Sequence, residues 1–414
     1  MLQITIENIA LLYHNILTMK RLIILFICCF ISLGLYAQSA ELDAWSSAYD
    51  MAQSVAEQLV YVENVAEGNY SGAETFFARA LDKLLTVYPD IDNLSEWEAA
   101  DHCARILSFQ LGEAKHTDSA QNIWQVVNYF SNPLVKAEAL IALGKIGNTA
   151  VLPQVVQLLN DLNSQPQSNT EMRERSERIA YGAILSLEYY KAPEGYLPVF
   201  FASTGWYADR IKNQASISLV NIISDPTEPL LEVVNNAGYT YDIKHLALRT
   251  SERSQSSSEN KARVAVAALT EGWRNQVSDI HQNQELTQMR KLALSMIRRY
   301  TTQDAAVYPQ LDRSYSNGDM DERLAVLYAL EALASEDAAR LLASYLAAIH
   351  QKRNSNTLTA SDEQLVRVII PALGNVGSAA RAQARPILIQ VQQSPNWTNT
   401  IKNLASEALR KIGN

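Results

Sequence analysis

The sequence predicts an all-α fold built from repeated helical hairpins, and three observations support this. A phrase recurs: A-L-I-A-L-G-K-I-G-N at 139–148 returns as P-A-L-G-N-V-G-S at 371–378 and as S-E-A-L-R-K-I-G-N at 406–414. Ala and Leu, both strong helix formers, dominate many stretches. The 15 Gly and 12 Pro among 414 residues are too few for a turn-rich β fold. Neighbouring hairpins are therefore expected to bury one another's apolar faces.

The N-terminal segment has the pattern of an export signal. Met19-Lys20-Arg21 is positively charged, an apolar run follows over 22–35, and Ala37 offers a small residue for cleavage. The run is shorter than the roughly 20 residues that a membrane-spanning helix needs. We therefore expect a signal peptide at 19–37, an over-extended start at 1–18, and a periplasmic or cell-envelope location. The alternative is an uncleaved anchor that holds the protein at the membrane.

The remaining chain divides into an N-terminal helical pair and a repeat array. Residues 41–66 and 73–87 each have the apolar spacing of a helix, and this pair is expected to cap the array within 38–96. The array then covers 97–414 with about eight hairpins, the last of them half a unit. Polar surface loops are expected at 161–170, 250–260 and 352–361.

The turn residues of one hairpin can be predicted individually. Gly147 is expected to end the first helix of this hairpin, because Gly adopts the left-handed conformation without a steric penalty. Pro153 is expected in the first turn of the following helix, where its missing N–H costs little. Together they place the bend of the hairpin between 147 and 153.

The motif A-L-x-x-[IVL]-G-[NS], followed by an apolar helix, resembles the HEAT-repeat family, especially the bacterial HEAT-like repeats that also occur in phycobilisome lyases. The resemblance is best at 134–162 and 365–393, and it covers most of 97–414. It implies a right-handed α-solenoid, the armadillo-type superhelix. Such arrays bind proteins along a concave face, here expected to be lined by the second helices of the hairpins.

The charge distribution argues against nucleic-acid binding. Residues 38–259 contain 29 acidic and 15 basic residues, a net charge of −14, whereas 260–414 contain 14 acidic and 18 basic residues, a net charge of +4. Binding to nucleic acids depends on many Lys and Arg contacts with phosphates, which an acidic chain does not supply. After signal cleavage only Cys103 would remain, so no internal disulfide can form, and a buried, inert thiol is expected.

The sequence contains no catalytic, cofactor or metal motif that we could assign. His102 and Cys103 are adjacent, but adjacent helical residues point in different directions. The stretch from Asp312 to Gly318 resembles the start of a calcium loop, yet its twelfth position is Arg323 instead of Glu. The acidic residues Asp319, Asp321 and Glu322 are instead expected to cap the following helix.

Aromatic residues are the remaining indication of a binding surface. Tyr and Trp are enriched at binding hot spots, although they are equally ordinary packing residues. The candidate protein-binding residues are Phe201, Trp206, Tyr207, Tyr239, Tyr241 and Trp273.

The sequence therefore favours an exported, non-catalytic scaffold that binds a protein partner. No cofactor or small-molecule substrate is inferred. One alternative is a structural or assembly component anchored in the envelope. Another is an enzyme of the bilin-lyase type, since those lyases share the repeat.

Overall fold

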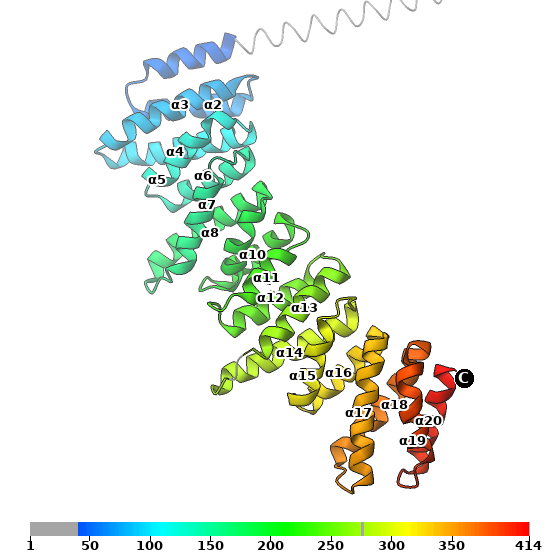
Figure 1. Ribbon diagram of the computed structural model, residues 1–414. Coiled ribbons are helices and arrows are strands. Elements are labelled where there is room, and N and C mark those ends of the chain that lie inside the picture. Colours follow the sequence, from blue (N-terminus) through cyan, green and yellow to red (C-terminus); the bar gives the residue numbers. More distant parts are fainter. Residues whose placement is uncertain (1–39, 275–276, 414) are drawn as a thin grey trace, which may run out of the picture. The chain divides into compact units, whose positions relative to one another are not determined.

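The structure is a computed structural model that describes residues 40–274 and 277–413. Across these ranges the regular structure is helical, without a strand (Figure 1), which confirms the all-α class. None of the helices in the described ranges is long and apolar enough to span a membrane. The described part of the chain divides into two compact units, with the division between Ile222 and Ile223. The predicted signal peptide at 19–37 and the segment 1–18 lie outside the described residues.

In the first unit, the helices pack in two layers. After a helical segment at 40–51 come α2 (Val55–Gly68), α3 (Ala73–Val87), α4 (Leu94–Glu113), α5 (Ala120–Tyr129), α6 (Pro133–Ile146), α7 (Leu152–Ser164), α8 (Thr170–Tyr190), α9 (Tyr196–Thr204) and α10 (Asp209–Ile222). The even-numbered helices form one layer, because α4 contacts α2 and α6, and α8 contacts α6 and α10. In the other layer α3 contacts α5, and α7 contacts α9. The core lies between the two layers.

The second unit repeats this arrangement. Its helices are α11 (Thr227–Asn235), α12 (Tyr241–Arg253), α13 (Ser258–Gly272), α14 (Ile280–Tyr300), α15 (Val307–Asn317), α16 (Met320–Leu333), α17 (Glu336–Asn354), α18 (Ala360–Val376), α19 (Arg381–Gln393) and α20 (Asn399–Ile412). The even-numbered helices from α12 to α20 again contact one another in order, and so do the odd-numbered helices from α11 to α19. Each hairpin therefore packs chiefly against the hairpins next to it along the chain.

Several helix ends form as the sequence predicts. Gly147 follows the last residue of α6 with a φ of 73°, and Pro153 lies in the first turn of α7. Asp319 is the N-cap of α16: its side chain accepts a hydrogen bond from the Glu322 N–H at 2.8 Å, and the Glu322 carboxylate accepts one from the Asp319 N–H at 3.1 Å. This reciprocal capping box satisfies two N–H groups that a helix start leaves unpaired, and it confirms the expected cap.

A second glycine in the recurring phrase has a packing role that sequence analysis did not predict. A Cβ atom at Gly144 in α6 would lie 2.6 Å from the backbone of Ser186 in α8, and one at Gly182 in α8 would lie 2.6 Å from the backbone of Ala137 in α6. Real Cβ atoms do not approach other atoms so closely. Glycine thus allows the backbones of α6 and α8 to pack in close contact. The approach at Gly374 in α18 is less close, since a Cβ atom there would lie 3.0 Å from the Ala408 Cα in α20.

The loops expected over 161–170 and 352–361 are confined to 165–169 and 355–359. Two further expectations about the elements are wrong. The single helix expected over 41–66 is interrupted at 52–54, where the Ser54 side chain accepts a hydrogen bond from Glu57 N–H and starts α2. The loop expected over 250–260 is largely helical, because α12 extends to Arg253 and α13 begins at Ser258. The intervening serines are held by side-chain hydrogen bonds, among them one from Ser256 to Asp225 at 2.7 Å.

Candidate functional site

The predicted aromatic residues fall into one group in each unit. Phe201, Trp206 and Tyr207 belong to the end of α9 and the segment after it, within the first unit. Tyr239, Tyr241 and Trp273 belong to the second unit. The two groups are therefore described separately.

In the first group, the aromatic rings join the end of α9 to the end of α7. The Trp206 ring is half-buried, and its indole N–H donates to the Leu162 carbonyl at 3.1 Å. Tyr207 is 1% exposed, its hydroxyl donates to Asn163 Oδ1 at 3.0 Å, and burial raises its pKa above the ordinary value. Phe201 is half-buried with its ring edge-on to Phe200. A partner-binding role for these residues stays a prediction.

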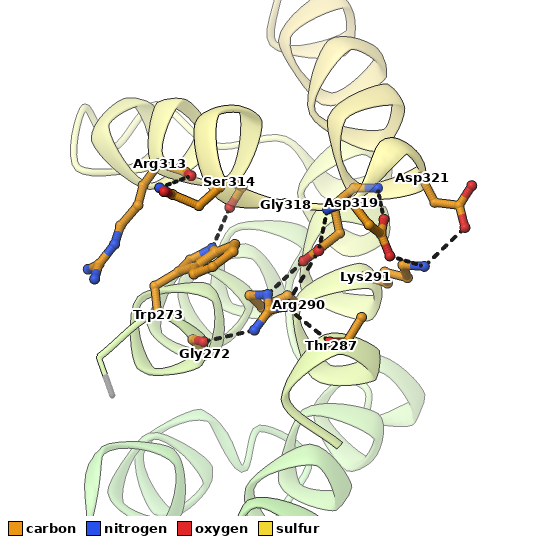
Figure 2. Close-up of polar contacts among 12 residues, drawn as sticks. Gly272, Trp273, Thr287, Arg290, Lys291, Arg313, Ser314, Gly318, Asp319 and Asp321 are labelled. Atoms are coloured by element: carbon orange, nitrogen blue, oxygen red, sulfur yellow. Dashed lines mark hydrogen bonds and ion pairs between the residues drawn. The ribbon is translucent and has the colours of Figure 1, made fainter. Parts of the chain in front are cut away.

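In the second unit, Trp273 takes part in a network between helices, shown in Figure 2. Its half-buried ring lies 4.0 Å from the Arg290 guanidinium, and its indole N–H donates to Ser314 Oγ at 2.7 Å. Arg290, which is 6% exposed, also donates to the Gly272 carbonyl at 3.1 Å and to Thr287 Oγ1 at 3.1 Å. Trp273 thus connects the end of α13 with α14 and α15.

The same arginine reaches the start of α16. Arg290 Nε donates to Glu322 Oε1 at 2.6 Å, and both side chains are almost fully buried. Glu322 is also the third residue of the Asp319 capping box, so one carboxylate serves the ion pair and the helix cap. Beside them, Lys291 bridges Asp319 and Asp321, at 3.0 Å from each (Figure 2). The charged side chains of this network are therefore explained by the packing between hairpins.

A groove of about 670 Å³ opens over three even-numbered helices of the first unit, and we call it the α2–α4–α6 groove. Its lining comes from α2, α4 and α6 alone. The lining residues are Glu63, Ala66, Glu67, His102, Arg105, Ile106, Phe109, Gln110, Glu138, Ile141, Ala142 and Lys145. Phe109 is 53% exposed, an unusual position for a large apolar ring. The groove therefore combines an exposed apolar floor with charged walls.

The basic residues of this groove are already paired with carboxylates. Arg105 donates to both oxygens of Glu138, at 2.8 and 2.9 Å, and these bonds raise the pKa of the guanidinium. The Lys145 ammonium pairs with Glu113 and lies 5.1 Å from the Phe109 ring. The groove thus has paired cations and an excess of acidic side chains.

A second groove, the α3–α5 groove of about 700 Å³, lies on the odd-numbered layer of the same unit. The lining residues are Asp82, Leu85, Thr86, Tyr88, Pro89, Gln125, Asn128 and Tyr129. Tyr129 is 58% exposed. Both layers of the unit therefore carry an open groove, whereas the sequence analysis expected binding along the second helices of the hairpins, which form the odd-numbered layer.

The second unit contains a smaller cavity of about 370 Å³, which we call the α12–α14 cavity. It lies where α12 and α14 begin and α13 ends. The lining residues are Ala237, Tyr239, Thr240, Tyr241, Asp242, Lys244, Glu271, Arg274, His281, Gln282 and Glu285. Two of the predicted aromatic residues, Tyr239 and Tyr241, are thus brought together in its wall.

The innermost residues of this cavity form a buried ion pair. The Lys244 ammonium donates to Glu271 Oε1, and the two residues are only 1% and 2% exposed. Arg274, about half exposed, approaches Glu271 Oε2 at 2.9 Å, but that oxygen accepts no hydrogen bond from the described residues. Glu285 pairs with His245 Nδ1 at 3.1 Å on the neighbouring side.

Sequence analysis missed the α2–α4–α6 groove and the buried ion pair of the α12–α14 cavity, although the sequence holds a signal for the ion pair. Lys244 occupies a core position of α12, because the buried residues Ala247, Leu248 and Ser251 follow it at helical spacing. A charged residue on an apolar stripe indicates a buried partner. Phe109 gives no such signal, since an aromatic residue in a helix is most often core.

Neither a cluster of three or more potential metal ligands nor a reactive thiol occurs among the described residues. No cluster of three or more His, Cys, Asp or Glu side chains in residues 40–274 and 277–413 is placed to hold a metal ion. Cys103 is fully buried, and burial raises the pKa of its thiol to about 12. The thiol is therefore protonated at neutral pH and is a poor nucleophile.

A comparison of the sequence with models of protein families finds no match, and a comparison with curated proteins finds none either.

Proposed function

We propose that this protein is an exported, non-catalytic scaffold of HEAT-like hairpins, arranged as a right-handed α-solenoid, that binds a protein partner through the α2–α4–α6 groove. The two-layer packing in each unit supports the repeat architecture, because every hairpin buries its apolar face against its neighbours. Export rests on the sequence pattern at 19–37.

The observation that carries the binding proposal is the exposed Phe109 ring within a groove of about 670 Å³. Aromatic rings in such grooves act as anchors, since they bury a large area at a low entropic cost. Ile106 and Ile141 extend the apolar surface along α4 and α6. A helix or an extended segment of a partner with an apolar side chain fits this floor.

The charges of the groove indicate the partner's chemistry. Three carboxylates line the groove: Glu138 is paired with Arg105, Glu63 lies 3.7 Å from His102 Nδ1, and Glu67 is the third. The wider region from 38 to 259 has a net charge of −14. Complementary potentials favour association, so the partner segment is expected to place Lys or Arg residues beside its apolar anchor.

The test is a binding experiment with two matched variants. The wild-type protein is used to capture partners from the cell envelope, and the captured protein is then titrated against purified variants by calorimetry. Phe109→Asp removes the anchor of the α2–α4–α6 groove, whereas Tyr129→Asp changes an equally exposed ring in the α3–α5 groove. Both positions are exposed, so neither change is expected to unfold the chain.

The proposal predicts that Phe109→Asp weakens binding by about 2 kcal/mol, as expected for a hot spot, while Tyr129→Asp leaves it unchanged. Binding should also weaken as salt rises, because the charged groups are exposed. If Tyr129→Asp weakened binding and Phe109→Asp did not, the binding surface would lie on the odd-numbered layer instead. Equal binding by wild type and both variants would contradict a role for either groove.

A further inference from the structure

The turn between α19 and α20, residues 394–398, is attached to the last turn of α17 by side-chain hydrogen bonds. The Trp397 indole N–H donates to His350 Nδ1 at 2.9 Å, and Arg353 Nε donates to the Asn396 carbonyl at 2.6 Å. The Arg353 guanidinium also lies 5.4 Å from the Trp397 ring, which is only 5% exposed. Residues more than 40 positions apart along the chain thus hold this turn in place.

The hydrogen bond from Trp397 determines the protonation state of His350. An indole N–H can only donate, so His350 Nδ1 must accept, and an imidazole nitrogen accepts only when it carries no proton. The other ring nitrogen, Nε2, lies 3.2 Å from the amide of Asn354 and carries the single proton of the neutral ring. The attached turn therefore requires a neutral His350.

The surroundings of His350 favour the same neutral form. Burial lowers the pKa of the half-buried imidazole below its ordinary value of 6.5. The hydrogen bond that the neutral ring accepts acts in the same direction, because the charged ring cannot accept it. Two independent features thus oppose protonation of this histidine while the turn is attached.

The charged side chains on the elements around α17 have other partners or are exposed. The turn at 394–398 has no charged residue of its own. The partnered groups are Asp362 with Lys352, Glu363 with Arg353, Asp312 with the Tyr345 hydroxyl, Arg323 with the Gly318 carbonyl, and Arg385 with the Gly413 carbonyl. The exposed groups are Arg313, Arg367 and Arg381. Protonation of His350 is therefore governed by its burial and by Trp397.

We propose that the α19–α20 turn is an acid-sensitive latch. Neutral His350 holds Trp397 against α17, whereas protonated His350 sets an N–H against the indole N–H and releases the turn. The bond from Arg353 to the Asn396 carbonyl is exposed and does not hold the turn by itself. Release makes the Trp397 ring accessible to water. The latch lies entirely in the second unit, so it is separate from the α2–α4–α6 groove.

The direction of the pH effect follows from the two states of the turn. His350 binds a proton more weakly in the attached turn than in the released turn, where its pKa returns towards 6.5. The latch is therefore fully closed above about pH 6.5, and it opens as the pH falls through the lowered pKa of His350.

The first experiment titrates the histidine rings of the mature chain by NMR. The His350 signal is assigned from its absence in His350→Asn or His350→Gln. The pKa of His350 should lie below 6.5 in the wild-type protein. In Trp397→Phe, which keeps an aromatic ring but lacks the N–H donor, this pKa should move back towards 6.5.

The second experiment measures release of the turn by hydrogen exchange and mass spectrometry. Exchange of residues 394–400 is compared between about pH 7.5 and about pH 5, across the titration range of histidine, after correction for the intrinsic effect of pH on exchange. His350→Asn is the decisive variant, because Asn offers an oxygen acceptor near the position of Nδ1 but does not titrate in this range. His102→Asn, at a half-exposed histidine of the first unit, is the matched control.

Protection of 394–400 in the wild-type protein and in His102→Asn should fall on acidification, by up to about tenfold for each unit by which the pKa of His350 is lowered. In His350→Asn it should stay constant. A His350 pKa at or above 6.5, or an equal loss of protection in wild type and His350→Asn, would overturn the proposal. If His350→Asn does not fold, the titrations of wild type and Trp397→Phe still decide.

Discussion

The Cα position of Gly144 in α6 faces the backbone of Ser186 in α8, so closely that a Cβ atom on Gly144 would lie 2.6 Å from it. The approach is possible only without a side chain at residue 144. Gly144 also belongs to the phrase that recurs along the chain, and Gly374 occupies the matching position in α18.

We expect Gly144→Ala to destabilise the first unit, although Ala is the better helix former. The added methyl group forces α6 and α8 apart, and overpacking of this kind costs about 1–3 kcal/mol, against a gain of roughly 1 kcal/mol in helix propensity. Thermal unfolding followed by circular dichroism measures the melting temperature, which reports the net effect of the two terms. Gly147→Asn is the control, because residue 147 is exposed and Asn tolerates its left-handed conformation. A melting temperature for Gly144→Ala at or above that of wild type would refute the packing role.

The Arg290–Glu322 pair allows a test of how the hairpins of the second unit are joined. Arg290→Met leaves the Glu322 carboxylate buried without its cation, and a loss of about 3–5 kcal/mol is expected. The double variant Arg290→Met/Glu322→Gln should recover much of this loss, since Gln is neutral and still suits the capping box with Asp319. Chemical denaturation of the three proteins makes the comparison. A double variant less stable than the single one would contradict this account.

Trp206 is expected to contribute to stability, and two substitutions separate this role from the predicted contact with a partner. Trp206→Phe loses the 3.1 Å hydrogen bond to Leu162 but keeps an aromatic ring, so a loss of about 1 kcal/mol is expected. Trp206→Ala also removes the ring beside Arg173 and Tyr207. If Trp206 contacts a partner, calorimetry should show weaker binding for Ala than for Phe. Unchanged binding by a folded Ala variant would assign the ring to packing alone.

The buried thiol of Cys103 gives a prediction for pH. Its pKa is raised from 9.0 to about 12 by burial, so the folded state keeps the proton where the unfolded state releases it. The contribution of Cys103 to stability is therefore complete below about pH 9 and is lost as the pH rises from there towards 12. Denaturation midpoints of wild type and Cys103→Ala across this range measure the difference. Relative to Cys103→Ala, the wild-type protein should lose stability as the pH rises above about 9. An equal dependence of the two midpoints on pH would contradict the raised pKa.

The features that sequence analysis predicted correctly depend on neighbouring residues. Gly147 and Asp319 act within their own turns, so the identity of a few adjacent residues is enough to place them. The break at Ser54 and the helical nature of 250–253 were missed for a different reason. Serine and arginine are compatible with both helix and loop. At 250–253 the burial of Leu248 and Ser251 favours the helix, whereas at Ser54 the side chain accepts from Glu57 N–H and starts a new helix.

The candidate sites depended on contacts that no local pattern encodes. Lys244 and Glu271 are 27 residues apart, and only the packing of α12 against α13 brings them together. Phe109 is exposed in the α2–α4–α6 groove, which the apolar spacing of α4 alone does not reveal. The predicted aromatic residues were identified by type, whereas their exposure depends on tertiary structure.

The packing of each hairpin against its nearest neighbours has a consequence for how the chain is made. In the first unit α4 needs α2, α3 and α6, all of which lie within about one hairpin of it along the sequence. Chains rich in such short-range contacts fold quickly and do not wait for distant segments. The N-terminal hairpins can thus reach their native packing while the C-terminal hairpins are still being synthesised, and each new hairpin adds to a surface that is already formed.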